Sequence, residues 1–423
     1  MTVLRHAGAR TPRLAVAWLL GALLAVPASG GGGGKCARWV GTWASSQQLT
    51  ETGNLPPATP GFSDTTLRQL VRVSIGGKWL RVRFSNAFGK AALTLVEARI
   101  ARAAGQSAIH AASDRALSFH GRTSVTIPAG AMVISDAVDF ELAPLCDVAV
   151  TVYLKGAPEE ITGHPGSRTT SHLQAGAAMR APELKDATRV DHWYFLSGID
   201  VEAGAGAAAV AVVGDSITDG RGSTTNGNDR WTDQLARRLQ AEKRTSEVAV
   251  LNHGLGGNRL LRDGLGPNVL ARLDRDVLAQ PGVRWLIVLE GINDIGTRVS
   301  ARAKGEPFAS AEDIIAAYEQ IVVRAHGHGI RVYGATILPF EGASNYFTPD
   351  GEADRQKVNA WIRTSGRFDA VIDFDAIARD PSQPSRLSPA VDGGDHLHPS
   401  AGGYKIMADA IDLRLFAADS VKP

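Results

Sequence analysis

One serine of this chain stands where its hydroxyl could act as a nucleophile. Ser216 lies in Gly214-Asp215-Ser216-Ile217, directly after the apolar run 208–213. We expect that run to be a buried strand, and Gly-Asp-Ser at its end adds nothing to core packing. A serine in this position would be held at the rim of a sheet, within reach of a substrate. Gly-Asp-Ser is also ordinary turn chemistry, so further groups are needed to indicate a nucleophile.

The other groups that acyl transfer requires occur downstream. The reaction needs a base, a group that orients the base, and donors for the oxyanion. Asp395 and His398 lie three residues apart, so one turn can let Asp395 hold the Nδ1 proton of His398 while Nε2 faces Ser216. Asn293 can direct a side-chain amide at the developing charge, and Gly257 can offer an unobstructed backbone N–H. Together these residues favour one catalytic site.

Each of these residues also has a simpler interpretation. His398 could be a surface histidine, Asn293 could cap a helix, and His396 with His398 could ligate a metal. The sequence contains no His-x-x-x-His with a downstream acid, no closely spaced cysteine pair and no Gly-x-x-x-x-Gly-Lys phosphate loop. We therefore expect neither a metal nor a cofactor.

The second half of the chain has the pattern of a parallel α/β sheet. Apolar strand candidates alternate there with helical stretches, such as the stripe formed by Trp231, Leu235 and Leu239. Such strands form a sheet covered on both faces, and ligands bind beyond their carboxyl ends. Ser216 and the segments 252–258 and 291–294 all follow strands, which places them at one edge. The strand candidates are residues 208–213, 248–251, 285–290, 332–337 and 370–374.

The first half instead has a period of two. Leu80, Val82 and Phe84 alternate with polar residues, which is typical of a half-buried strand, and Gly76-Gly77 before them predicts a hairpin turn. Many short strands favour an antiparallel β-sandwich or jelly roll. Further candidates are residues 71–75, 93–100, 123–127, 138–142 and 148–154, whereas residues 158–182 are expected to form loops. We predict a β-domain over 36–200 and an α/β domain over 207–418.

The composition limits the location and partners of the protein. Residues 1–30 of the 423 resemble a secretory signal, with three arginines, a short apolar run and small residues at its end. We therefore expect a secreted or periplasmic protein without stable membrane insertion. The net charge of +2 includes those arginines, and no basic patch indicates nucleic acid. Cys36 and Cys146 could form a disulfide or remain two buried thiols.

The motifs resemble the sequence blocks of a known family, and they occur in that family's order. Gly214-Asp215-Ser216-Ile217, Gly257-Asn258, Gly291-Ile292-Asn293-Asp294 and Asp395-His396-Leu397-His398 resemble the four blocks of the SGNH (GDSL-type) hydrolases. The resemblance extends from residue 207 to 416. It implies a three-layer α/β/α domain and ester hydrolysis by serine, histidine and aspartate, with an oxyanion hole from the N–H groups of Ser216 and Gly257 and the amide of Asn293. Residues 220–231 are similar to a secreted subgroup with an N-terminal β-domain.

These observations predict a serine esterase that acts through an acyl-serine intermediate. We expect the substrates to be short-chain esters, because no long apolar lid segment occurs near the site. Acetyl groups on polysaccharides are one substrate of this kind. The alternatives are a lysophospholipase or lipase-like acylhydrolase, and a catalytically silent glycan-binding protein. The β-domain could bind glycan through Trp39, Trp43 or Trp79, or serve as a structural wall. The expected partner is a small ester or an acetylated glycan, and no pattern in the sequence defines an oligomeric state.

Overall fold

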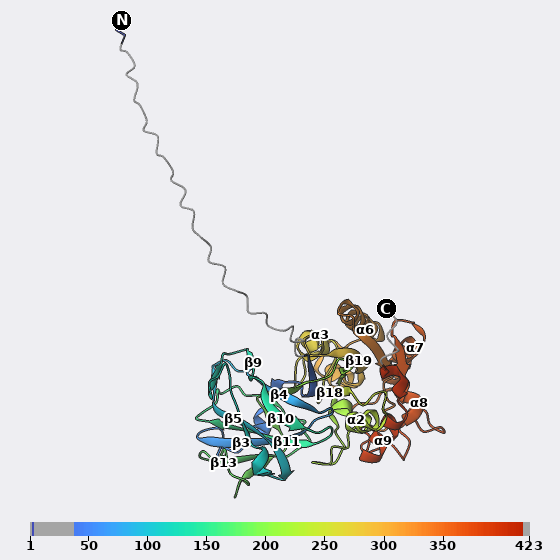
Figure 1. Ribbon diagram of the computed structural model, residues 1–423. Coiled ribbons are helices and arrows are strands. Elements are labelled where there is room, and N and C mark those ends of the chain that lie inside the picture. The colour runs from blue at the N-terminus through green and yellow to red at the C-terminus, as the bar shows by residue number, and fades with distance from the viewer. Residues whose placement is uncertain (1, 4–37, 418–423) are drawn as a thin grey trace, which may run out of the picture. The chain divides into compact units, whose positions relative to one another are not determined.

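The structure, a computed structural model, describes residues 2–3 and 38–417. The signal predicted over residues 1–30 lies almost wholly outside this part of the chain, and Cys36 lies outside it. Residues 38–417 belong to one compact unit. Its strands are antiparallel up to Glu202 and parallel from Ala208 onward, and Figure 1 colours the first group blue to green. The boundaries of two separate domains, 36–200 and 207–418, stay a prediction.

The antiparallel part forms three sheets within the described residues. The first contains β1 (Trp39–Ala44), β16 (Leu196–Glu202), β4 (Gly77–Ser85), β10 (Val138–Leu142) and β9 (Met132–Ile134). The second contains β14 (Thr188–Val190), β13 (Ser171–Ala175), β3 (Thr65–Arg72), β11 (Asp147–Leu154), β5 (Leu93–Gly105), β6 (Ala108–Ile109), β7 (Arg115–Leu117) and β8 (Val125–Ile127). The third contains β15 (Trp193–Tyr194), β12 (Thr162–His164) and β2 (Gln48–Leu49).

The inner faces of the two larger sheets share one hydrophobic core. Leu80 and Val82 of β4 pack in the same buried cluster as Leu67 of β3 and Val150 of β11. The apolar face predicted for β4 is confirmed, since Leu80, Val82 and Phe84 are all fully buried. The alternation itself holds only in part, because Arg83 and Ser85 are buried as well. Short 3₁₀ turns at Thr52–Asn54 and Ala111–Ser113 connect strands in this part.

The hairpin predicted at Gly76-Gly77 is wrong. Strands β3 and β4 belong to different sheets, because β3 pairs with β11 and β13 whereas β4 pairs with β16, β10 and β9. The two glycines allow close backbone approach at the crossing between sheets. A Cβ on Gly76 would lie 2.3 Å from the carbonyl oxygen of Leu142, and one on Gly77 would lie 2.8 Å from that of Glu202.

The segment 158–182, predicted as loops, contains two strands. β13 pairs along its whole length with β3, and β12 pairs with β2 and β15. Neither strand shows a regular apolar alternation. β12 reads Thr-Gly-His and is buried along its length, and β13 reads Ser-His-Leu-Gln-Ala. Tertiary pairing rather than local propensity creates them.

The parallel part confirms the predicted α/β class. Its five strands have the order β18-β17-β19-β20-β21, with bounds Ala208–Gly214 (β17), Val248–Gly254 (β18), Val283–Leu289 (β19), Arg331–Ala335 (β20) and Ala370–Ile372 (β21). The first strand, β17, lies between the second and the third, so the strand order reverses at β17. Ligands in open α/β sheets bind at such a reversal point.

Helices follow the strands of this sheet. They are α1 (Ser216–Asp219), α2 (Trp231–Ala241), α3 (Val269–Leu273), α4 (Ile292–Gly296), α5 (Arg298–Lys304), α6 (Ala311–Gly327), α7 (Pro349–Thr364), α8 (Phe374–Ala378) and α9 (Ala401–Asp409). A π-helical turn, Asp274–Leu278, extends α3, and a 3₁₀ turn, Leu413–Phe416, ends the described chain. Figure 1 shows α6 to α9 in brown to red.

The apolar stripe predicted at Trp231, Leu235 and Leu239 explains how α2 packs, and α6 packs through a similar stripe. Trp231 and Leu235 of α2 and Ile314 and Tyr318 of α6 are fully buried in the core of the parallel part. Ser310 starts α6 by accepting a hydrogen bond from the N–H of Asp313, as an N-cap serine does.

The two parts of the compact unit pack directly against each other. Val40 of β1 lies in one apolar cluster with Ala209, Ala249 and Leu251 of the parallel sheet. Gly41 allows this approach, because a Cβ there would lie 3.0 Å from the Leu251 side chain. The interface is thus continuous with the hydrophobic core of the antiparallel part, residues 39–202, which we call the β-region.

Candidate active site

The nucleophile candidate lies at the reversal point of the parallel sheet. Ser216 is the first residue of α1, directly after β17. The Asp215 carboxylate caps this helix by accepting the N–H of Ile217 at 2.8 Å. Gly214 has no room for a side chain, because a Cβ would lie 2.2 Å from the hydroxyl oxygen of Thr218. This tight turn leaves the Ser216 hydroxyl at the carboxyl end of β17.

A chain of two hydrogen bonds joins Ser216 to the base and its carboxylate. The Ser216 Oγ lies 2.8 Å from Nε2 of His398, and Nδ1 of His398 lies 2.7 Å from Asp395 Oδ2. Because an ionised carboxylate only accepts, Nδ1 donates its proton to Asp395. Nε2 of a neutral ring is then free to accept the serine proton.

The loop that carries Asp395 and His398 is arranged by local hydrogen bonds. Asp395 Oδ1 accepts the N–H groups of Leu397 at 3.1 Å and His398 at 2.8 Å. His396 points elsewhere, with its Nδ1 2.5 Å from Asp392 Oδ2 and its side chain 52 % exposed. The spacing Asp-x-x-His therefore selects His398 over His396.

The electrostatics of this pair suit a general base. Burial lowers the pKa of His398 below its usual 6.5, and it outweighs the opposing hydrogen bond and charge of Asp395. Partial burial opposes ionisation of Asp395, but hydrogen bonds from the backbone and ring of His398 lower its pKa overall. At neutral pH the ring is therefore a free base beside an ionised carboxylate.

The predicted oxyanion donors are held close to the nucleophile turn. The carbonyl of Gly214 accepts the N–H of Leu255 at 3.0 Å, which ties the loop containing Gly257 to β17. Asn293 Nδ2 donates to the carbonyl of Asn258 at 2.8 Å. An amide nitrogen carries two N–H groups, so one remains for a substrate oxygen.

Two backbone N–H groups complete this set. Within residues 38–417, those of Ser216 and Gly257 make no hydrogen bond. Gly257 has φ +68, a left-handed conformation that favours glycine. The use of these three donors in an oxyanion hole stays a prediction.

A fully buried arginine, which sequence reasoning missed, connects these loops. Arg272 Nη2 donates to the carbonyl of Gly214 at 3.2 Å and to Asn258 Oδ1 at 2.7 Å. Its Nη1 donates to Asp276 Oδ2 at 2.9 Å and to Ser46 Oγ at 2.8 Å. The sequence signal that could have indicated this residue is a single arginine in the otherwise apolar helix α3.

Three buried carboxyl groups interact electrostatically at the nucleophile turn, to which Asp215 itself belongs. Burial raises the pKa of Asp215 to about 7 and that of Asp294 to about 6. The pKa of Glu290 is raised well above its usual value, first by burial and then by repulsion from Asp215. Both side-chain oxygens of Glu290 are buried without a hydrogen-bond partner in the protein, so the neutral acid is the favoured form.

Other predicted residues have simpler surroundings. Trp43 is buried and packs edge-on against Trp193, with ring centroids 4.9 Å apart, so it serves packing rather than glycan binding. Trp39 lies under the Arg81 guanidinium and Trp79 is 36 % exposed, and a glycan contact at either stays a prediction. Cys146 is half-buried, and its disulfide with Cys36 also stays a prediction.

Residues 38–417 contain neither a cluster of metal-ligating side chains nor a membrane-spanning helix. No group of three or more histidine, cysteine, aspartate or glutamate side chains is arranged to hold a metal ion. None of the helices there combines the length and apolar character needed to cross a membrane.

Comparison with known proteins identifies the parallel part. The model of the GDSL-like lipase/acylhydrolase family matches residues 212–406. Among solved structures, an acetylxylan esterase from Geobacillus stearothermophilus is 23 % identical, with 49 % of this chain and 94 % of that chain covered and a TM-score of 0.39. A GDSL-like lipase from Bacteroides thetaiotaomicron is 17 % identical, with 48 % and 84 % covered and a TM-score of 0.35. Curated proteins gave no match. The C-terminal half of the chain is therefore a GDSL-like lipase/acylhydrolase domain of the SGNH type, preceded by an extra N-terminal region.

Proposed function

We propose that this protein is a serine esterase that hydrolyses short-chain carboxylic esters through an acyl-serine intermediate. The observation that carries the proposal is the unbroken hydrogen-bonded chain from Ser216 through His398 to Asp395, at 2.8 and 2.7 Å. These are the three groups that acyl transfer to a serine requires, in hydrogen-bond contact and in the required order.

The reaction would proceed in two halves. Ser216 Oγ attacks the ester carbonyl while its proton moves to Nε2 of His398, and the negative charge forms on the carbonyl oxygen. The N–H groups of Ser216, Gly257 and Asn293 would stabilise that charge. As the intermediate collapses, His398 returns the proton to the leaving alcohol. Water then attacks the acyl-serine with His398 again as base, which releases the carboxylic acid and restores Ser216.

The segment beside the site favours a polar substrate with a short acyl group. Residues 220–230 contain no aliphatic or aromatic side chain. This segment lies against the base, because a Cβ on Gly222 would be 3.8 Å from the His398 Cβ. Arg168 and Arg221 also act electrostatically on His398. Acetyl esters carried by a carbohydrate have this combination of a polar body and a small acyl group, and the signal-like segment 1–30 supports export toward such substrates.

A single-chain lysophospholipid is the second candidate substrate, because family members include lipases and acylhydrolases. It would need an apolar channel for a long acyl chain. A series of aryl esters from acetate to decanoate separates the two. We expect kcat/KM to fall steeply beyond butyrate, and a rise toward decanoate would favour the lipase-like alternative.

The mechanism is tested by replacing the nucleophile. Ser216→Ala should abolish turnover of an aryl acetate, since loss of a triad serine costs about 10⁶-fold in kcat in another hydrolase. An organophosphonate should add covalently to Ser216 and nowhere else, as peptide mass spectrometry would show. Ser300→Ala, at an exposed serine of α5, is the matched control and should keep full activity. Full activity in Ser216→Ala would exclude Ser216 as the nucleophile. A parent protein that neither turns over aryl acetate nor reacts with the phosphonate would instead favour the silent glycan-binding alternative.

A further inference from the structure

The helix that carries the nucleophile is too short to hold its own position. α1 has four residues, and a single helical turn is unfavourable by itself because its ordering entropy exceeds the gain from its few hydrogen bonds. Hydrogen-bond donors from outside α1 hold its C-terminal end instead. Asn252 Nδ2 donates to the carbonyl of Thr218 at 2.8 Å, and Arg230 Nε donates to that of Asp219 at 3.0 Å.

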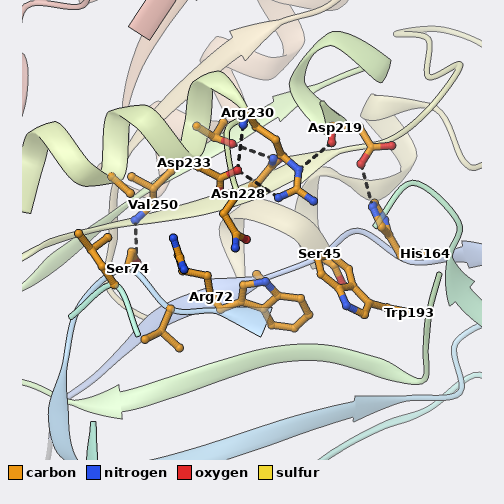
Figure 2. A pocket seen from close by; sticks show the side chains of 17 residues that line it. Ser45, Arg72, Ser74, His164, Trp193, Asp219, Asn228, Arg230, Asp233 and Val250 are labelled. Carbon is orange, nitrogen blue, oxygen red and sulfur yellow. Dashed lines mark hydrogen bonds and ion pairs between the residues drawn. The ribbon is translucent and has the colours of Figure 1, made fainter. Parts of the chain in front are cut away.

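A residue of the N-terminal β-region provides a further hold. His164, at the end of β12, places Nε2 2.9 Å from Oδ1 of Asp219, the last residue of α1. Both side chains are 4 % exposed. Figure 2 shows this contact beside Arg230 and Trp193. It joins residues 55 positions apart and crosses from the antiparallel to the parallel part.

The hydrogen-bond partners of His164 imply an additional proton. Its Nδ1 lies 2.7 Å from the carbonyl oxygen of Ser46, which can only accept. Its Nε2 faces a carboxylate, which also only accepts when ionised. Both contacts are satisfied only if the ring carries two protons or Asp219 carries one. The form with a doubly protonated ring is an ion pair and is stronger than a hydrogen bond between two neutral groups. In either form the contact fixes the position of the Asp219 side chain.

The loop after β12 closes over the same end of α1. Gly166 packs on Asp219 so closely that a Cβ there would lie 1.7 Å from Oδ2. The carbonyl of Ser167 accepts a hydrogen bond from Arg230, whose guanidinium also lies over the Trp193 ring. The pocket here has a volume of about 50 Å³, which is room for ordered water rather than a substrate. The contact is therefore structural support for the turn and not a second ligand site.

We propose that His164 is a positioning residue for the nucleophile, which it orients by fixing Asp219 at the far end of α1. The inference rests on the proposed function of Ser216. It makes the β-region part of the catalytic apparatus rather than a separable module. Because a displacement of about 1 Å can cost a catalyst about 10²-fold, loss of this contact should lower kcat while KM stays nearly unchanged.

The two ring nitrogens allow a matched pair of variants. The amide nitrogen of glutamine occupies a place similar to Nε2 and can donate to Asp219, whereas that of asparagine resembles Nδ1 and reaches only Ser46. We expect His164→Gln to keep kcat for an aryl acetate within about 3-fold of the parent. His164→Asn and His164→Ala should lose about 10- to 100-fold, with KM changed less than about 2-fold.

Asp219 gives the reciprocal test. In Asp219→Asn the amide can donate to Nε2 of a neutral His164 while Nδ1–H still donates to Ser46, so this variant should retain activity. Asp219→Ala loses the contact and should lose activity as His164→Ala does. In the double variant His164→Ala/Asp219→Ala the two losses should not add, because both remove one interaction.

Titration of active sites with an organophosphonate separates positioning from folding. The kcat values are calculated per reactive serine, so unfolded protein does not contribute. A loss in kcat per site for His164→Asn but not His164→Gln supports the proposal. Equal kcat per site in all His164 variants, or equal losses in Gln and Asn, would overturn it. If a His164 variant does not fold, the pair Asp219→Ala and Asp219→Asn decides, because the proposal expects a loss in kcat per site for the first and not for the second.

Failure of the proposed function would look different. In that case the parent protein would neither turn over aryl acetate nor react with the phosphonate at Ser216. An active, phosphonate-labelled parent with unaffected His164 variants would refute the positioning role alone.

Discussion

The hydroxyl of Tyr346 donates to Oδ1 of Asn293 at 2.6 Å. At the other end of the amide, Nδ2 donates to the carbonyl of Asn258. These two partners determine which way the amide faces, so its remaining N–H has a fixed direction. Tyr346 reaches this position by packing on Gly296, where a Cβ would lie 2.0 Å from its ring. Nothing in the local sequence around Tyr346 indicates this role, because its partner is 53 residues away.

We therefore expect Tyr346→Phe to lower kcat for an aryl acetate about 3- to 10-fold with little change in KM. An oxyanion donor acts mainly after charge develops, so a less well oriented Asn293 should slow the chemical step. Asn293→Ala should cost about 10²- to 10³-fold in kcat.

The double variant provides the control. If Tyr346 acts through Asn293, then Tyr346→Phe should have no further effect in the Asn293→Ala background. Additive losses in kcat, or losses that appear only in KM, would instead assign Tyr346 to substrate binding.

The second prediction separates the two neighbouring histidines. His398→Ala should be nearly inactive, and Asp395→Asn should lose about 10⁴-fold, as in another serine hydrolase where the ring then adopts the wrong tautomer. His396→Ala should change kcat less than about 3-fold, because that ring bonds to Asp392 and is half exposed. Steady-state rates on aryl acetate suffice. An active His398→Ala beside an inactive His396→Ala would contradict the assigned base.

The third prediction concerns the pH profile of kcat/KM. His398 must be neutral to accept the serine proton, so activity should fall on the acid side as the ring of the free enzyme protonates. Since burial lowers the pKa of His398, the midpoint of that fall should lie below the usual 6.5. His396→Ala should leave the midpoint unchanged. A midpoint clearly above 6.5 would mean that the charge of Asp395 outweighs desolvation at His398.

Much of the site could be predicted because its residues follow strands directly. Ser216 and Asn293 occur at the carboxyl ends of β17 and β19, and chain order alone assembles these ends in a parallel sheet. The Asp395–His398 pair is likewise local, since three residues separate its members. A short-range motif therefore predicted the Asp395–His398 contact, whereas the contact between Ser216 and His398 joins residues 182 positions apart and depends on the fold.

The supporting residues could not be predicted, because their contacts are long-range. His164 lies in a strand without apolar alternation, and Arg272 reaches Ser46 from 226 residues away. The hairpin predicted at Gly76-Gly77 was wrong for a related reason. Two glycines between alternating runs suit a turn, but here they serve a close crossing beside Leu142 that only the tertiary fold creates.

The last prediction uses the buried carboxyl group of Glu290. Its pKa is raised in the folded protein, and that of Asp215 is raised to about 7. Such acids stay protonated in the native state after the unfolded chain has ionised. Their contribution to stability is therefore complete below the unfolded pKa values near 4 and is lost as pH rises through the folded values. Glu290→Gln cannot ionise and also removes repulsion from Asp215, so it should be more stable than the parent at pH 8.

We expect the free energy of unfolding of Glu290→Gln to exceed that of the parent at pH 8, because only the parent must keep a buried acid protonated or ionise it there. The difference between the two proteins should be smaller at pH 5 than at pH 8, because pH 5 is closer to the range below about 4 in which Glu290 of the parent is protonated in both its folded and unfolded states. Urea unfolding at the two pH values measures this difference, and the other titrating groups cancel because both proteins contain them. Glu306→Gln, at an exposed position, should show no such pH-dependent gain. A constant difference between pH 5 and 8 would mean that Glu290 is ionised throughout, and therefore that it has a charged partner or ordered water in the native protein.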